Sequence, residues 1–314
     1  MATSKSQVHL PEPEYAQPDF NSRAHKAWYH PDISNRVPAA ASHILISADL
    51  LNKYSRIPPD QQLEHIHKIR DQAWDIRVYP CIGIGAFLDP QLRLDPLYPT
   101  IIETLRNGGT LIDVGTFIGH DLRRLAYDGD IPTDKLYGID IVDWEAVGYD
   151  FFRDKDTFQG TFIQADILSG SLAEVRGTDS AKQQALARLT EDKADVVFIS
   201  QVLHQWDWEG QVHAASNLAA GFSKVGTLIM GNQMGTTQGA REVGLDALDG
   251  AKAWRHDAQS IARMFEEDVA ARTGTKWEAQ ARVKTVEEMG WTQDDVKWLD
   301  PGVCWLEFAA KRVA

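Results

Sequence analysis

The stretch LIDVGTFIGHD at residues 111–121 decides the fold of this chain. Its first four residues have the apolar character of a short buried strand. The glycines that follow, Gly115 and Gly119, suit a turn in which the backbone approaches a ligand closely. The polar residues from Asp121 onward begin a helix. A strand, a glycine-containing turn and a helix in this order predict the ligand-binding edge of an open α/β sheet.

The acid at the end of this strand, Asp113, indicates which ligand the turn would hold. A dinucleotide-binding turn has the spacing G-x-G-x-x-G and places a pyrophosphate at the helix N-terminus. Here the spacing is G-x-x-x-G, and the Asp113 carboxylate would repel a pyrophosphate but attract an ammonium group near a sulfonium. The pattern therefore predicts S-adenosylmethionine as cofactor rather than NAD. An ordinary strand–turn–helix joint is the simpler alternative.

Two later acids end the next two expected strands, LYGIDI and TFIQADI. Asp140 suits the two ribose hydroxyls, and Asp166 suits the adenine amino group while Ile167 packs on the ring. Each acid taken alone is equally compatible with a helix cap or a surface position. Arg123 and the amides near Gly119 are candidates for the methionine carboxylate. The residues expected to bind the cofactor are Asp113, Gly115, Gly119, Asp140, Ile141, Asp166, Ile167 and Ser200.

Apolar runs alternate with amphipathic helical segments along the rest of the chain. The expected strands are residues 110–114, 136–141, 161–167, 194–200, 226–231, 277–285 and 303–312. This alternation predicts an α/β fold with a Rossmann-like, doubly wound, seven-stranded and mostly parallel sheet, whose last two strands pair antiparallel at one edge. Residues 231–250 are rich in glycine and are expected to be irregular.

The chain ahead of this alternation has a different character. Residues 1–38 are polar and broken by prolines, so we expect an irregular segment. Residues 39–95 are expected to form a helical cap or lid, because apolar residues recur at spacings of three and four between Leu63 and Trp74. Residues 96–314 would then be the S-adenosylmethionine-binding domain. The apolar helices of the cap make a homodimer possible.

Composition excludes several classes of partner. The chain has 314 residues with 32 Lys and Arg against 45 Asp and Glu, a net charge of −13. Nucleic-acid binding and attachment to an anionic membrane both need basic surface, so a small-molecule acceptor is the expected partner. The two cysteines, Cys81 and Cys304, predict neither a disulfide framework nor a metal site. The polar N-terminus has no apolar signal region, and we expect a cytoplasmic protein.

The segment SQVLHQWDW at residues 200–208 follows the fourth expected strand. His204 is the candidate catalytic residue, as a general base or a hydrogen-bonding partner of the acceptor; a structural histidine is an equally good interpretation. Trp206 would wall an apolar acceptor pocket, with core packing an equally good interpretation. Arg255 would bind an acceptor carboxylate as a fork, with a surface salt bridge as the alternative. The expected acceptor-binding residues are Trp28, Trp206, Arg255 and His256.

Several blocks together resemble one family. They are YPCI at residues 79–82, the DVGxxxGxDLR pattern ending at Arg123, LHQWDWEGQ at residues 203–211 and WRHD at residues 254–257. Over roughly residues 25–312 the chain is similar to small fungal methyltransferases of meroterpenoid and other secondary-metabolite biosynthesis. The resemblance implies the class I S-adenosylmethionine-dependent methyltransferase fold and O-methylation of a natural product. It also implies that some members act on the carboxyl group of a farnesylated polyketide acid.

The chemistry of the acceptor separates the possible reactions. A carboxylate is already ionised at neutral pH, whereas a phenol has a pKa near 10 and benefits from a base such as His204. A carboxyl acceptor is favoured, with a phenol or enol hydroxyl next. Two alternatives keep the same fold, namely a non-catalytic S-adenosylmethionine-binding regulator and a cyclase assisted by the sulfonium. A nicotinamide oxidoreductase is disfavoured by Asp113 and the glycine spacing.

Overall fold

A computed structural model of the chain describes residues 29–34, 49–169, 179–244, 252–288, 292 and 300–314. The chain divides into two compact units. Among the described residues, the N-terminal unit ends at Ile163 and the C-terminal unit begins at Gln164. Trp28, residues 39–48 of the expected helical cap and most of the segment 1–38 lie outside the described residues.

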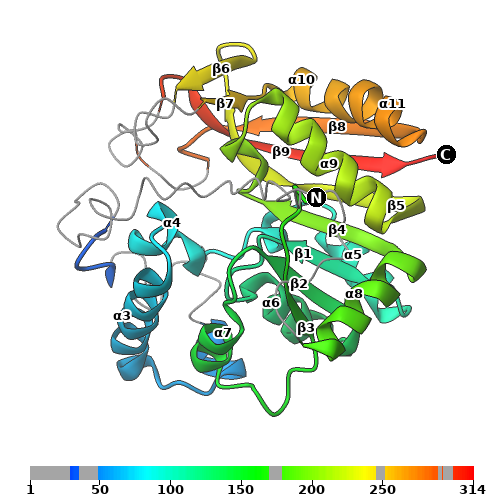
Figure 1. Ribbon diagram of the computed structural model, residues 1–314. Helices are drawn as coiled ribbons and strands as arrows, with labels where there is room; N and C mark the ends of the chain where they lie inside the picture. The colour runs from blue at the N-terminus through cyan, green and yellow to red at the C-terminus, as the bar shows by residue number, and fades with distance from the viewer. Residues whose placement is uncertain (1–28, 35–48, 170–178, 245–251, 289–291, 293–299) are drawn as a thin grey trace, which may run out of the picture. The chain divides into compact units, whose positions relative to one another are not determined.

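The described N-terminal unit holds short helices, three strands and four longer helical elements (Figure 1). Its helical elements are η3 (Leu50–Tyr54), α3 (Pro59–Ile76), α4 (Pro80–Gly83), η4 (Ala86–Leu88), η5 (Leu92–Leu94), α5 (Tyr98–Arg106), α6 (His120–Gly129), η6 (Thr133–Lys135) and α7 (Glu145–Phe152). Its strands are β1 (Leu111–Val114), β2 (Leu136–Asp140) and β3 (Thr161–Gln164), the last residue of which belongs to the C-terminal unit.

Helix α3 confirms the periodicity of its sequence. A proline occupies its first turn, where the missing amide hydrogen costs nothing. Its residues Ile66, Ile69, Ala73 and Trp74 are all at most 1% exposed. They share one hydrophobic core with Phe151 of α7. The described helices of the expected cap therefore pack in the same core as residues that follow β1.

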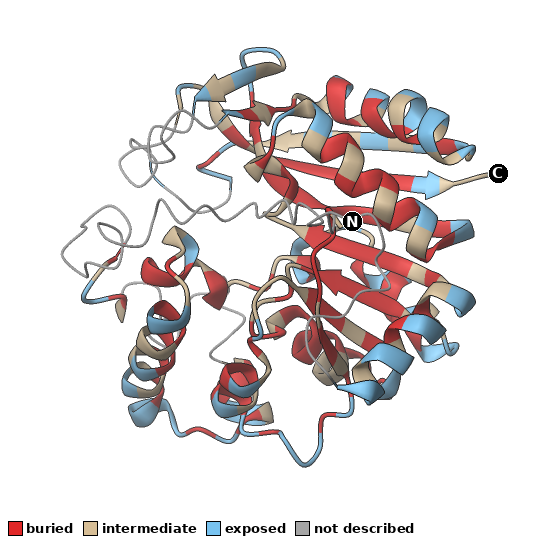
Figure 2. Cartoon of the chain, viewed as in Figure 1, coloured by how far each residue is buried: buried red, intermediate tan, exposed pale blue. Residues whose placement is uncertain are grey.

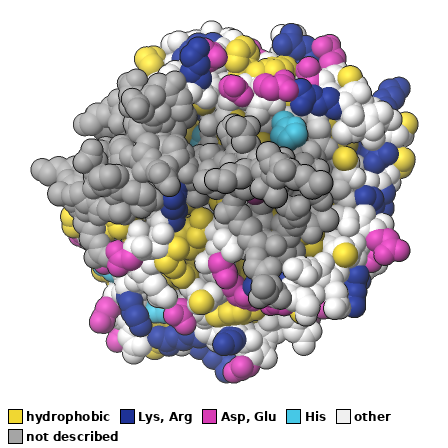
Figure 3. Space-filling model, viewed as in Figure 1, with side chains coloured by type: hydrophobic (Ala, Val, Ile, Leu, Met, Phe, Trp, Pro, Cys, Tyr) yellow, Lys and Arg dark blue, Asp and Glu magenta, His cyan; other side chains and the backbone are white. Residues whose placement is uncertain are grey.

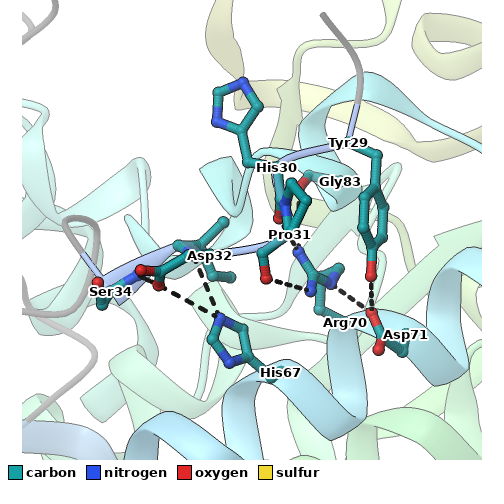
Figure 4. Close-up of polar contacts among 10 residues, drawn as sticks. Tyr29, His30, Pro31, Asp32, Ser34, His67, Arg70, Asp71 and Gly83 are labelled. Atoms are coloured by element: carbon teal, nitrogen blue, oxygen red, sulfur yellow. Dashed lines mark hydrogen bonds and ion pairs between the residues drawn. The ribbon is translucent and has the colours of Figure 1, made fainter. Parts of the chain in front are cut away.

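A buried arginine on α3 holds the short segment 29–34 in place (Figure 4). Arg70 is 2% exposed, and its guanidinium donates to the carbonyl oxygen of His30 at 2.6 Å and to Asp71 at 2.5 Å. The same group lies 4.2 Å from the centre of the Tyr29 ring, whose hydroxyl donates to Asp71 at 2.7 Å. His67 accepts the backbone N–H of Ile33 at 3.2 Å. Segment 29–34 is thus anchored to α3 by side chains of the helix.

The C-terminal unit contains the remaining strands and helices (Figure 1). Its strands are β4 (Ala194–Ser200), β5 (Ser223–Thr236), β6 (Arg241–Gly244), β7 (Lys252–Arg255), β8 (Trp277–Lys284) and β9 (Val303–Arg312). Its helical elements are α8 (Ser180–Asp192), η7 (Leu203–Gln205), α9 (Trp208–Phe222), α10 (Ala258–Arg263), η9 (Met264–Val269) and α11 (Ala270–Thr273).

The strands are hydrogen-bonded in the order β3-β2-β1-β4-β5-β9-β8. Strands β1 and β2 pair in parallel, as do β4 and β5, whereas β9 pairs antiparallel with both β5 and β8. The predicted seven-stranded, mostly parallel sheet with two antiparallel edge strands is therefore confirmed. Helix α9 buries one side against this sheet and η9, so it alternates buried and exposed residues, while β4 is buried along most of its length (Figure 2).

The expectation of an irregular stretch at residues 231–250 is wrong in its described part. Strand β5 continues to Thr236, and β6 pairs antiparallel with β7 in a separate two-stranded ribbon. Gly235 explains the error. A Cβ on Gly235 would lie 2.7 Å from the carbonyl oxygen of His256, so this glycine permits close packing of two backbones rather than a turn.

Acidic and basic side chains are interspersed over the described part of the face in Figure 3. On that face the excess negative charge is not gathered in one described patch, which fits a solvated surface. Among the described residues, no helix has both the length and the apolar character needed to span a bilayer.

Candidate functional site

The turn between β1 and α6 has the backbone conformation that its glycines predict. Gly115 and Gly119 have φ angles of 73° and 68°, in the left-handed region that other residues adopt at a cost. A Cβ on Gly119 would lie 2.5 Å from a guanidinium nitrogen of Arg123 and 2.8 Å from the Phe162 ring. Glycine is therefore required at position 119 for both conformation and space.

The same turn is tied by its backbone to the end of β2. Phe117 has a φ of 49°, which is strained for a bulky residue. Its N–H donates to one oxygen of Asp140 at 3.0 Å, and the N–H of Val142 donates to the other at 3.0 Å. The N–H of Gly115 donates to the carbonyl oxygen of Ile139 at 2.7 Å. The structure thus brings the candidate residues that follow β1 and β2 together, and the loop fixes the Asp140 carboxylate.

Two candidate acids of the N-terminal unit, Asp113 and Asp140, lie in surroundings that disfavour the charged carboxylate. Burial raises the pKa of Asp140 to about 6, against the opposing effect of its two backbone hydrogen bonds. Burial, together with the nearby Asp121, raises the pKa of Asp113, although the Thr116 hydroxyl donates to it at 2.8 Å. A cationic ligand would supply the missing positive charge and restore ionisation. Asp113 thus fits the ammonium group and the nearby sulfonium of S-adenosylmethionine, and an ionised Asp140 fits its ribose hydroxyls.

Arg123 is committed to the protein interior. Its side chain is fully buried and binds Asp154 through two hydrogen bonds of 2.9 and 3.1 Å. A third donor reaches the carbonyl oxygen of Ile118 at 3.2 Å, and the guanidinium lies 3.9 Å from the centre of the Phe158 ring. These contacts occupy the fork, so the structure assigns Arg123 to bracing the β1–α6 turn rather than to a methionine carboxylate.

In the C-terminal unit, Asp166 has one oxygen that lacks a partner. The residue is 4% exposed, and one oxygen accepts the N–H of Leu168 at 2.9 Å. The other oxygen is buried and has no hydrogen-bond partner among the described residues. A buried acceptor left unpaired is costly, so this oxygen fits a donor such as the adenine amino group. Ile167, next to it, is 7% exposed.

Helix α9 holds the loop that carries Asp166. The side-chain amide of Asn217 donates to the carbonyl oxygens of Ile167 and Ser169, at 2.9 and 3.2 Å. A ring nitrogen of His213 lies 3.1 Å from the carbonyl oxygen of Leu168. Sequence reasoning missed Asn217 and His213, because a polar residue on an amphipathic helix gives no local sign of a distant loop.

The end of β4 is held by Asn232 of β5. The Ser200 hydroxyl donates to the Asn232 side-chain oxygen at 3.1 Å, and the Gln201 side-chain amide donates to the same atom at 2.8 Å. Gln201 has a φ of 56°, and its N–H donates to the carbonyl oxygen of Asn232 at 2.7 Å. Ser200 thus lies in a polar cluster whose centre, Asn232, the sequence analysis did not select.

His204 lies in the turn η7 and is a weak base in this environment. Burial, helped by the positive charge of Arg255, lowers its pKa to about 3. Its Nδ1 has no hydrogen-bond partner among the described residues, and neither does the indole nitrogen of Trp206, which is 6% exposed. At neutral pH this turn therefore presents a neutral imidazole and an unpaired N–H donor.

Arg255 and His256 are buried more deeply than expected. Arg255 is 2% exposed, binds Asp300 at 3.1 Å and donates to the carbonyl oxygen of His204 at 2.9 Å. His256 is fully buried, with Nδ1 2.8 Å from the Ser260 hydroxyl and Nε2 without a partner among the described residues. Burial lowers the pKa of His256 to about 3. Arg255 holds the His204 turn, and its acceptor-binding role stays a prediction, as does that of Trp28.

Comparisons with known proteins point in the same direction. The model of the meroterpenoid methyltransferase N-terminal domain matches residues 28–88. O-methyltransferase atr3 of Stereocaulon alpinum is 34% identical over 289 residues, which cover 91% of this chain and 76% of that protein. Methyltransferase adrK of Penicillium roqueforti is 30% identical over 78% of this chain and 80% of its own length. The Asnovolin E/Chermesin D methyltransferase nvfJ of Aspergillus novofumigatus is 36% identical over 54% of this chain and 56% of its own length.

Proposed function

This chain belongs to the fungal methyltransferase family that includes O-methyltransferase atr3, and we propose that it methylates the carboxylate of a natural-product acid. It is an S-adenosylmethionine-dependent methyltransferase. The cofactor supplies an electrophilic methyl group on a sulfonium. The residues present fit it on two observations, namely the raised pKa values of Asp113 and Asp140 and the unpaired oxygen of Asp166.

The surroundings of His204 carry the choice of acceptor: its Nδ1 is buried without a hydrogen-bond partner among the described residues, and the positively charged Arg255 binds its carbonyl oxygen, so the pKa of the ring is lowered. A phenol has a pKa near 10, and an imidazole with a pKa of about 3 is a poor base for removing its proton. A carboxylic acid with a pKa near 4 arrives already ionised. Its oxygen needs orientation and removal of water rather than deprotonation. The neutral turn η7 suits this requirement.

The chain's own residues contribute orientation. In-line methyl transfer requires the acceptor oxygen to be held close to the methyl carbon, and positioning of this kind supplies much of the rate. The unpaired indole N–H of Trp206 is a donor that suits a carboxylate or carbonyl oxygen. His204, being neutral, places no positive charge there that would stabilise the ground-state carboxylate and reduce its nucleophilicity.

An acceptor that carries both groups tests the proposal. We expect the purified chain to convert a farnesylated hydroxybenzoic acid and S-adenosylmethionine into a methyl ester, which mild alkali cleaves. His204→Gln should raise the acceptor KM by about fivefold, through loss of a contact worth about 1 kcal/mol. The same variant should leave kcat within about twofold, because no proton is removed.

The measurement is product identification by mass spectrometry before and after alkali, together with steady-state kinetics of both proteins. An alkali-stable methyl ether as the main product would overturn the carboxyl assignment. A fall of kcat by about a hundredfold in His204→Gln, with KM unchanged, would restore His204 as a general base. The matched control is His65→Gln, because the His65 ring hydrogen-bonds to the carbonyl oxygen of Phe151 within the N-terminal unit.

A further inference from the structure

Gln211, in the first turns of α9, joins two segments that are distant in sequence. It is fully buried, and its side-chain amide donates to the carbonyl oxygens of Trp206 and Trp254, at 2.9 and 2.8 Å. Its side-chain oxygen accepts from Gln233 at 3.4 Å. One carboxamide therefore connects the end of the η7 turn with β7, and all three of its contacts lie inside the C-terminal unit.

The η7 turn is fixed mainly through these contacts. Trp206 has no regular secondary structure, and its carbonyl oxygen accepts from both Gln211 and the backbone N–H of Trp254, the latter at 2.8 Å. Arg255 supports the same turn through the carbonyl oxygen of His204. The position of the His204 and Trp206 side chains therefore depends on donors supplied by α9 and β7.

Asn217, further along α9, makes the corresponding contacts on another side of the helix. At 3.6 residues per turn, positions 211 and 217 point in directions about 120° apart. Asn217 also donates to two carbonyl oxygens of a loop, those of Ile167 and Ser169, on either side of Leu168. The loop so held carries Asp166, whose unpaired oxygen is the candidate partner of adenine.

Helix α9, which carries Gln211 and Asn217, is itself held firmly in place by packing and by its N-terminal cap. Its apolar residues are buried on the sheet, including Val212, Ala215, Leu218, Ala219 and Phe222, each at most 1% exposed. Asp207 caps its N-terminus by accepting the N–H of Gly210 at 2.8 Å. A helix fixed in this way can hold two loops in register with each other.

We propose that Gln211 and Asn217 are positioning residues, Gln211 for the acceptor-binding turn η7 and Asn217 for the adenine-binding loop 166–169. The first half of this inference rests on the proposed function, since it takes η7 as the acceptor side. The second half needs only S-adenosylmethionine. Neither residue touches a reacting atom. Gln211 acts by fixing the backbone of the segment that would contact the acceptor, and Asn217 by fixing the backbone of the loop that would contact adenine.

Two substitutions in the full-length chain separate these roles. Gln211→Leu removes the amide that donates to the carbonyl oxygens of Trp206 and Trp254. The acceptor KM should therefore rise by about tenfold, while the Kd of S-adenosylhomocysteine stays within about twofold. Asn217→Leu should raise the Kd of S-adenosylhomocysteine by about tenfold and leave the acceptor KM, at saturating cofactor, within about twofold. Calorimetric titration gives the Kd, and initial rates give the KM.

Conservative variants and a matched control keep the test independent of folding. Gln211→Glu and Asn217→Asp keep size and oxygen but lose the donating amide, so each should reproduce its leucine partner's shift. Gln62→Leu removes another buried carboxamide, which donates to the carbonyl oxygen of Ile57 at 3.0 Å in the N-terminal unit. It should lower the melting temperature without moving either constant.

The outcomes separate this inference from the proposed function. A wild-type chain that forms no methyl ester overturns the proposed acceptor, and the Asn217 arm is still decided by titration. A wild-type chain that forms the ester, while Gln211→Leu and Gln211→Glu keep the wild-type KM, overturns the role of Gln211. Equal changes of both constants in both residues would show a general structural effect and overturn the inference.

Discussion

The turn after β1 and the segment after β4 are held in place by different means. Residues 115–119 are fixed largely by their own backbone, through left-handed φ angles and N–H bonds to Ile139 and Asp140. Residues 200–206 are fixed by side chains from β5, β7 and α9, chiefly Asn232, Arg255 and Gln211. The turn after β1 is therefore encoded largely by its own residues, whereas the segment after β4 depends on side chains that lie far away in the sequence.

The largest effect should come from the buried ion pair of Arg123 and Asp154, which braces the β1 turn by side chains. Arg123→Met leaves the Asp154 carboxylate buried without its guanidinium, which should lower the free energy of unfolding by about 3–5 kcal/mol. Urea unfolding of the two proteins measures this difference. The control, Arg272→Met, removes an exposed pair with Glu209 and should cost less than about 1 kcal/mol. Equal losses in the two variants would mean that Arg123 is no more than a surface ion pair.

This difference also explains how far the sequence could be read. The spacing of Gly115 and Gly119 predicts a turn because glycine is the residue that tolerates their φ angles, and the acids follow β1 and β2 at positions set by strand length. Apolar runs likewise locate the seven strands, and a period of 3.6 residues locates α3. All of these signals lie within a few residues of the feature they predict.

The residues that hold other parts of the site through tertiary contacts give no local sequence signal. Arginine is a residue type that binds carboxylates, so the sequence predicts that Arg255 binds the acceptor. Its partner Asp300 lies 45 positions further along the chain, and only the folded chain brings the two together. Gln211 and Asn217 look like ordinary polar positions of an amphipathic helix. Gly235 looks like a turn residue although it permits close backbone packing. These features depend on tertiary contacts, so no local pattern could have predicted them.

Two glycines of equal conformation separate backbone strain from packing in the β1 turn. Gly119 and Gly274 have φ angles of 68° and 66°, but a Cβ meets atoms at 2.5 Å only at position 119 and nothing within 4 Å at position 274. Gly274→Ala should lower the free energy of unfolding by about 1 kcal/mol. Gly119→Ala should lower it by about 3 kcal/mol, because overpacking adds about 2.

The same two variants should also differ in how tightly they bind S-adenosylhomocysteine. Gly119→Ala should also weaken S-adenosylhomocysteine binding by at least about tenfold, since the turn must move to admit the methyl group. Gly274→Ala should leave the Kd unchanged. Urea unfolding and calorimetric titration measure the two quantities. Equal destabilisation of both variants would show that conformation alone, and not the packing against Arg123 and Phe162, requires glycine at position 119.

The smallest effect should be a pH dependence confined to the cofactor side. The folded-state pKa of Asp140, about 6, lies above the unfolded value of about 3.9. The ligand-free fold therefore retains a proton there and loses stability as pH rises from about 4 to 6. S-adenosylmethionine needs the ionised Asp140 carboxylate, so its affinity for the protein rises as the pH increases through about 6. Ionisation of Asp140 alone predicts that the Kd of S-adenosylmethionine falls about fourfold between pH 5.5 and 7.5, and the raised pKa of Asp113 adds to this.

On the acceptor side, His204 and His256 have pKa values of about 3, so both stay neutral throughout the same interval. The KM of a carboxylate acceptor, measured at saturating cofactor, should therefore change by less than about twofold between pH 5.5 and 7.5. Asp140→Asn should reduce the change in Kd to the part that Asp113 contributes, and leave the KM profile as it is. A KM that follows the cofactor's pH dependence would contradict the separation of the two sides, because a titrating group would then have to act on both.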